Sequence, residues 1–348
     1  MSVVSVAMPV FNGARFLGEA IESVLAQTHR DLELIISDDG STDGSQEIAR
    51  AYAASDARIV LVAGCHGGIA AAMNRALAVA RGVYFAPMDQ DDIALPDRLE
   101  KLASFLGGNE DIVLVGGGMR LIDEHGNGGR RKNRPLKPSD VAAAMRTSTA
   151  VIHPTSMMRT AAVRALGGYR SILPYAEDYD LWLRLMEHHQ MANIADIVLL
   201  KRIHPAAVTQ DSSQRAAQVV ARAIAYLSHL SRVTFGEDIV HSGEPLVVSA
   251  ARFIDTYLDQ CDALAAPVRH NMSRFMRYAP LLTTGPRVVN RPYWRYVTKA
   301  LRSGGVRHAP RTLWYLALYF GYHRWRQDEL LKAFPALRDL GEAAAIAA

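Results

Sequence analysis

Carboxylates gather at three places in the chain. The densest group is Asp89, Asp91 and Asp92, three acidic residues within four positions. Such carboxylates repel one another unless a cation or solvent screens them, and Mg²⁺ and Mn²⁺ prefer oxygen ligands that include phosphate oxygens. This acidic loop therefore predicts a metal site for a phosphate-bearing ligand. The alternative is an acidic turn that caps the following helix.

The second group is Asp38 and Asp39, followed by Gly40-Ser41-Thr42-Asp43. A carboxylate at this position can accept hydrogen bonds from a nucleobase N–H or from ribose hydroxyls. The same residues would also suit a helix N-cap, with the glycine making the turn. Both roles are compatible if Asp39 faces the ligand and the later residues cap the helix.

The third group, Glu177 and Asp178, opens a segment with helical spacing that contains Trp182. A carboxylate beside an apolar wall has a raised pKa and can serve as a general base. The alternative is that acidic residues complement the positive end of the helix dipole.

Short apolar runs alternate with helical patterns through the first 90 residues, and they place the first two acidic groups at strand ends. Such alternation predicts a parallel sheet with right-handed crossovers, in which ligands bind beyond the carboxyl ends of the strands. The expected strands are 2–11, 32–37, 58–63 and 83–88, and the expected helices are 14–26, 44–54 and 69–80.

Later segments are less regular. Residues 112–115 and 194–200 are expected strands, 139–144 and 178–187 expected helices, and the Gly- and Arg-rich segment 116–134 an expected mobile loop. The apolar positions in 212–230 predict an amphipathic helix, and 246–264 and 312–323 are further helix candidates. We therefore expect an α/β domain over 1–210 and a mainly helical C-terminal region over 211–348.

Composition is that of a globular protein: 348 residues, 49% of them hydrophobic, with two cysteines far apart. Such cysteine usage fits a reducing compartment. No apolar run approaches the roughly 20 residues that span a bilayer, and the first apolar run ends in Asn12-Gly13, unlike a signal peptide. A cytoplasmic location is expected.

Residues 263–327 contain twelve Lys or Arg, no Asp or Glu, and three of the four tryptophans. Aromatic and basic residues favour the headgroup zone of anionic membranes. This region predicts a peripheral contact at the inner face of a membrane. The alternative is a helical subdomain that packs its aromatic residues inward. No nucleic-acid motif is present, and nucleic acid is not an expected partner.

Taken in order, five motifs resemble those of family 2 glycosyltransferases, which have the GT-A fold, a Rossmann-like and mostly parallel sheet flanked by helices. The resemblance covers roughly residues 2–210. Its motifs are the first strand SVAMPVFN, the turn SDDGSTD, the central helix AMNRA, the DxD segment MDQDDIALPDRL and the ED motif EDYDLWLR.

The resemblance implies a donor site for a nucleotide-diphosphate sugar, with uracil as the commonest base. Phe11 would stack on the base and Asp39 would hold a base N–H. The full implied set for nucleotide-sugar binding is Pro9, Phe11, Asp38, Asp39, Asn74 and Asp89.

The resemblance also implies that Asp91 holds Mn²⁺ or Mg²⁺ across the diphosphate, with His204 as a metal or phosphate contact. Asp178 would be the base, and Glu177 and Trp182 would lie near the acceptor, a glycan or lipid-linked hydroxyl. One displacement by that hydroxyl would invert the anomeric configuration. The implied activity is that of a hexosyl- or N-acetylhexosaminyltransferase in surface polysaccharide or glycolipid synthesis.

One departure concerns the central helix. Many relatives have Arg before its Asn, whereas this chain has Met73 there and Arg75 after it. The basic partner of the diphosphate therefore stays open. A Rossmann-type oxidoreductase is disfavoured because no G-x-G-x-x-G follows the first strand, and the loop there is a poor match for a nucleotidyltransferase. A non-catalytic nucleotide-sugar binding or membrane-associated interaction protein is the remaining alternative.

Overall fold

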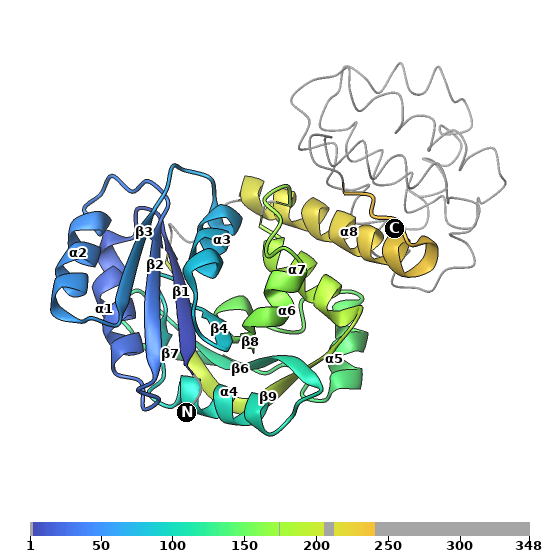
Figure 1. Cartoon of the computed structure of the whole chain (residues 1–348), viewed down its shortest axis with the longest axis horizontal. Helices are drawn as coiled ribbons and strands as arrows, with labels where there is room; N and C mark the ends of the chain where they lie inside the picture. Colours follow the sequence, from blue (N-terminus) through green and yellow to red (C-terminus); the bar gives the residue numbers. More distant parts are fainter. Residues whose placement is uncertain (1–2, 174, 205–211, 241–348) are drawn as a thin grey trace, which may run out of the picture. The chain divides into compact units, whose positions relative to one another are not determined.

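Figure 1 shows a computed structural model of the chain, which describes residues 3–173, 175–204 and 212–240. The chain divides into two compact units, Met1–Ser242 and Gly243–Ala348. The described residues all belong to the first unit. The helices predicted at 246–264 and 312–323 and the basic region 263–327 fall beyond them.

The first half of the fold is a parallel sheet with helical crossovers, as the sequence predicted. Its strands lie in the order β3-β2-β1-β4, and β1 pairs with both β2 and β4. Three helices connect them. The elements in chain order are β1 (Val4–Val10), α1 (Ala14–Leu25), β2 (Leu32–Asp38), α2 (Ser45–Ser55), β3 (Ile59–Ala63), α3 (Ile69–Val79) and β4 (Tyr84–Pro87).

Beyond β4 the same sheet becomes mixed. It continues through β8 (Met157–Arg159), β6 (Ile112–Ile122), β9 (Gln190–Arg202) and β5 (Ile93–Ala94). Strand β8 is antiparallel to both of its neighbours, whereas β6 and β9 run parallel. The alternation of strand and helix stops after β4, so the sequence pattern did not reveal these antiparallel pairs.

The expectation of a mobile loop over 116–134 is wrong. Strand β6 continues to Ile122 and pairs with β7 (Gly128–Lys132) as a hairpin. A Cβ at Gly117 would lie 2.5 Å from the side chain of Val198, so the glycine lets β9 approach. Glycine within a strand often marks such a close approach. The sequence pattern shows the missing side chains but not the neighbour that fills their place.

The remaining helices follow β4 in the chain. They are α4 (Arg98–Gly107), α5 (Pro138–Met145), the 3₁₀ turn η1 (His153–Thr155), α6 (Thr160–Ala165), α7 (Glu177–Met186) and α8 (Ser212–Phe235). None of the helices within the described ranges is long and apolar enough to cross a membrane.

Helix α8 packs beside α7 and belongs to the first compact unit (Figure 1). Arg232 and His229 of α8 both contact the carboxylate of Glu187, at 2.7 and 2.8 Å. The sequence division after residue 210 assigned this helix to the C-terminal region. A helix is placed by the surface that its apolar face contacts, and that surface is not visible in the helix's own periodicity.

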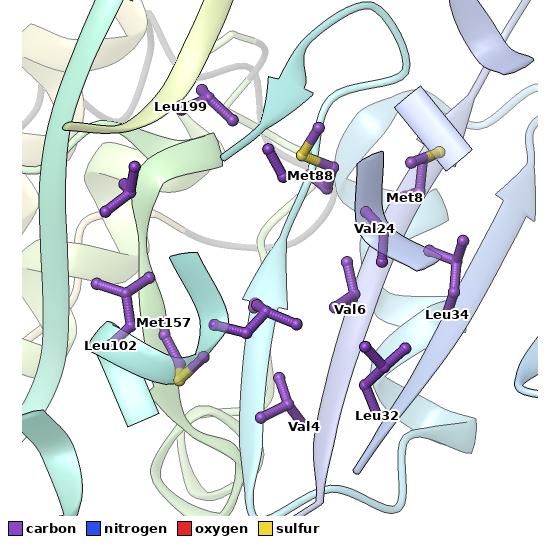
Figure 2. Packing of buried hydrophobic residues seen from close by; sticks show 14 of the residues in the cluster. Val4, Val6, Met8, Val24, Leu32, Leu34, Met88, Leu102, Met157 and Leu199 are labelled. Atoms are coloured by element: carbon purple, nitrogen blue, oxygen red, sulfur yellow. The ribbon is translucent and has the colours of Figure 1, made fainter. Parts of the chain in front are cut away.

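The hydrophobic core fixes the positions of the first strands. Val4, Val6 and Met8 of β1 alternate toward one face and pack with Leu32 and Leu34 of β2, all nearly inaccessible to solvent (Figure 2). Successive side chains of a strand point to opposite faces, and Ser5 and Ala7 on the other face of β1 are buried too. Because β1 and β2 are packed along their lengths, the residues that follow them emerge from a rigid edge.

Candidate functional site

The acidic loop follows β4 directly. Asp89, Asp91 and Asp92 each offer one carboxylate oxygen, and these three oxygens lie within 4.8 Å of one another. Burial, together with the charges of Asp89 and Asp91, raises the pKa of Asp92 to about 7, although the charge of Lys201 opposes the shift. Oxygen ligands under mutual repulsion suit a hard divalent cation. The residues present therefore fit the predicted metal.

The end of β9 supplies positive charge to this loop. Lys201 Nζ lies 3.1 Å from Asp89 and 3.4 Å from Asp92. The backbone N–H of Arg202 donates to Asp92, and His204 Nε2 lies 2.9 Å from Asp91 Oδ2. The predicted pair of Asp91 and His204 is thus brought together. The pKa of Lys201 is raised because attraction to the two carboxylates outweighs the effect of burial.

A second cluster lies where β1 and β2 end. Asp39 is 3% exposed, accepts hydrogen bonds from the N–H groups of Gly67 and Gly68, and binds Arg75 at 2.6 Å. Burial raises the pKa of Asp39, but these hydrogen bonds outweigh it and the pKa is lowered. Arg75, the basic residue whose role the sequence left open, therefore contacts Asp39.

Phe11 lies beside this cluster. Its side chain is 42% exposed, and its ring centroid is 4.2 Å from that of His66, whose Nδ1 lies 3.2 Å from Asp39. An exposed ring next to a buried carboxylate is the arrangement that the sequence predicted for nucleobase binding. Aromatic side chains bind bases by stacking on them.

Three other residues predicted to bind the nucleotide sugar contact the backbone of neighbouring segments. Asp38 accepts hydrogen bonds from the N–H groups of Gly40 and Ser41, as in a turn. Asn74 exchanges two hydrogen bonds with the backbone of Tyr169, and Pro9 pairs with Ser37 in the sheet. Their direct contact with a nucleotide sugar stays a prediction.

Helix α7 begins with Glu177 and Asp178. Asp178 is partly exposed and accepts a hydrogen bond from the N–H of Tyr179 at 2.6 Å. Glu177 is buried, and its Oε2 has no hydrogen-bond partner among the described residues. Burial first, and then the charge of Asp178, raise the pKa of Glu177 to about 8. Glu177 is therefore protonated at neutral pH.

His153 links α7 to the acidic loop. It is buried, with Nε2 3.0 Å from the hydroxyl of Tyr169. Burial lowers its pKa, while the charges of Asp178 and Asp89 oppose the shift. The imidazole of His153 therefore interacts electrostatically with the carboxylates of both Asp178 and Asp89. The candidate base and the acidic loop therefore both lie within electrostatic range of His153.

Trp182 lies behind this region. Its side chain is buried, Nε1 donates to the carbonyl of Val151 at 3.3 Å, and its ring lies 5.9 Å from that of His153. It supports the histidine in this structure, and its predicted contact with the acceptor stays untested. The sequence predicted no role for Lys201 or for His153, because no spacing connects either residue to the acidic groups.

Comparison with known proteins supports a common family. The glycosyl transferase family 2 model matches residues 5–167. The chain is 44% identical over 190 residues to the putative glycosyltransferase EpsE of Bacillus subtilis. This alignment covers 53% of this chain and 66% of EpsE. The chain is also 33% identical over 203 residues to the uncharacterized glycosyltransferase MJ1057 of Methanocaldococcus jannaschii. That alignment covers 57% of this chain and 70% of MJ1057.

Solved structures show the same architecture. S. aureus TarS in complex with UDP-GlcNAc matches with a TM-score of 0.57 at 16% identity, covering 87% of this chain and 92% of that one. The mannosyltransferase PcManGT from Pyrobaculum calidifontis, in complex with GDP-Man and Mn²⁺, matches with a TM-score of 0.50 at 17% identity, covering 99% and 86%. Family model, relatives and fold agree, and the chain belongs to glycosyl transferase family 2, with the GT-A fold.

Proposed function

We propose that this protein transfers a sugar from a nucleotide-diphosphate sugar to an acceptor hydroxyl with inversion. The observation that carries the proposal is that His153, which packs against Trp182 of α7, lies within the electrostatic reach of both Asp89 and Asp178. A donor bound at the acidic loop would present its reacting carbon toward α7.

The donor base is proposed to be uracil. Phe11 would stack on it, next to the buried carboxylate of Asp39. TarS was solved with UDP-GlcNAc, which supports this choice, whereas PcManGT was solved with GDP-Man. The two neighbours differ in base, and the choice of uracil therefore needs a direct test.

Asp91 and His204 are proposed to hold Mn²⁺ or Mg²⁺, next to the carboxylates of Asp89 and Asp92, and PcManGT was solved with Mn²⁺. When bound, the ion supplies positive charge that stabilises the departing diphosphate without a proton donor. Lys201 holds the carboxylates of Asp89 and Asp92 in place beside it.

Asp178 is proposed as the base that takes the proton of the acceptor hydroxyl. The adjacent Glu177 has its pKa raised to about 8 and is protonated at neutral pH, so it can donate a hydrogen bond but is a poor proton acceptor. A single attack by the acceptor hydroxyl on the anomeric carbon, from the side opposite the diphosphate, inverts the configuration at that carbon. The acceptor is proposed to be a growing surface glycan or glycolipid. The membrane contact proposed for residues 263–327 involves residues that the structure does not describe.

The test is the Mn²⁺-dependent release of UDP from UDP-sugars, together with calorimetric binding of UDP. We expect the wild type to release UDP with Mn²⁺ and to stop in EDTA. Asp91→Asn should lose both binding and turnover. Asp178→Asn should keep binding but lose turnover by about 10²–10⁴-fold, the usual contribution of a general base. Asp97→Asn, which changes an exposed ion pair with Lys101, is the matched control.

Two results would contradict the proposal. UDP binding without turnover by the wild type, across a panel of UDP-sugars and acceptors, would favour a non-catalytic binding protein. Stronger stabilisation by guanosine or thymidine diphosphates than by UDP would overturn the choice of base.

A further inference from the structure

The side chain of Gln90 joins the acidic loop to the end of β1. Phe11 N donates to Gln90 Oε1 at 2.9 Å, and Gln90 Nε2 donates to the carbonyl of Phe11 at 3.1 Å. One amide thus satisfies both backbone groups of the residue that carries the exposed ring. The two residues lie 79 positions apart in the chain, and Gln90 is the immediate neighbour of Asp91.

The turn after Phe11 is shaped to receive this amide. A Cβ at Gly13 would lie 2.3 Å from Gln90 Oε1, so a larger residue there would displace the glutamine. On its other side the turn is held by Ser41 and Ser45, whose hydroxyls accept the N–H groups of Asn12 and Gly13 at 3.0 and 2.9 Å. The turn is therefore fixed between the β2–α2 loop and Gln90.

The ring of Phe11 is partly open to solvent. The residue is 42% exposed, and its ring contacts that of His66, whose side chain is itself 64% exposed. Such an exposed neighbour constrains the ring less than a packed core would, so the fixed backbone of Phe11 contributes to the direction of its side chain. The position of the stacking face consequently depends in part on the two hydrogen bonds from Gln90.

We propose that Gln90 is a positioning residue for nucleobase binding, which acts through the peptide of Phe11 and ties the base site to the metal loop. This inference rests on the proposed function. It predicts that Gln90 contributes to the binding of the nucleoside part of the donor and not to the binding of its diphosphate.

The experiment measures the affinity of the full-length protein for two ligands, UDP and inorganic pyrophosphate, each with Mn²⁺. The variants are Gln90→Met, Phe11→Ala and the double variant. Methionine keeps the length of the side chain but removes both hydrogen bonds. The net free-energy contribution of a hydrogen bond is modest. We therefore expect Gln90→Met to weaken UDP binding about tenfold and to leave pyrophosphate binding unchanged.

The double variant separates positioning from a general structural effect, because coupled residues give non-additive effects. In the Phe11→Ala background, Gln90→Met should cause no further loss of UDP affinity. In steady state the same change should raise the KM for the donor and leave kcat unchanged.

Each other result overturns the inference. Additive losses, or an unchanged affinity for UDP, would show that Gln90 does not act through Phe11. An equal loss with pyrophosphate would place its effect on the metal loop. A wild type that binds pyrophosphate but not UDP would refute the proposed donor and this inference together, whereas additive losses refute the inference alone.

Discussion

Glu177 gives the sharpest test of the electrostatics of the site. It is 7% exposed, lacks a partner at Oε2 among the described residues, and has its pKa raised from 4.5 to about 8 by burial and by Asp178. Folding keeps its proton, while the unfolded chain releases it above about pH 4.5. The stability contributed by this group is therefore complete below pH 4.5 and is lost as pH rises toward 8.

The magnitude follows from the width of this window. Stability falls by up to about 1.4 kcal/mol per pH unit between the two pKa values. Between pH 5.5 and 7 the wild type should thus lose about 2 kcal/mol relative to Glu177→Gln, which carries no titrating group at this position. All other groups cancel in the comparison to the extent that the substitution leaves them unchanged.

The assay is urea unfolding at several pH values, followed by the fluorescence of Trp182, which is buried on the same helix. Replacing Trp294, Trp314 and Trp325 by phenylalanine leaves Trp182 as the sole tryptophan of the chain.

The matched control is Glu33→Gln. Glu33 is also buried, but hydrogen bonds from Ser5 and Arg81 outweigh the effect of burial and lower its pKa. Its stability contribution is lost only as pH falls below about 4.5, so the control should show no slope between pH 5.5 and 7. A wild type and Glu177→Gln that differ by a constant amount across this range would refute the reasoning, because Glu177 would then ionise normally in the folded protein.

Two further predictions concern buried charges. Lys201→Met removes the ion pairs of Lys201 with Asp89 and Asp92, so the free energy of unfolding without metal should fall by about 3–5 kcal/mol. Mn²⁺ should raise the Tm of this variant more than that of the wild type, and equal Mn²⁺ shifts in thermal melts would contradict the prediction. Asp180 is fully buried and forms ion pairs with Arg170 and Arg184, so Asp180→Asn should lower the free energy of unfolding in urea by about 3–5 kcal/mol. The control Glu47→Gln, which changes an exposed pair with Arg50, should lower it by less than about 1 kcal/mol. Similar losses in the two variants would count against the buried pairing.

The sequence by itself determined those features that depend on neighbouring residues. The short, β-branched apolar run of β1 and the turn that follows it placed Phe11 at a strand end, and the same reasoning placed Asp39 and the acidic loop. These predictions were possible because a strand and its terminal turn are specified within about ten residues. The parallel half of the sheet follows from the same local alternation of strand and helix.

Tertiary structure decided which distant groups meet. Lys201 reaches Asp89 across 112 positions, and Gln90 reaches Phe11 across 79. His153 lies within electrostatic range of two acidic groups that no sequence spacing connects to it. The glycines of β6 suggested a loop, because the residues of β9 that pack against them are distant in sequence. Such contacts depend on strand order and register, which are set by the packing of whole elements and leave no periodic signal in the chain.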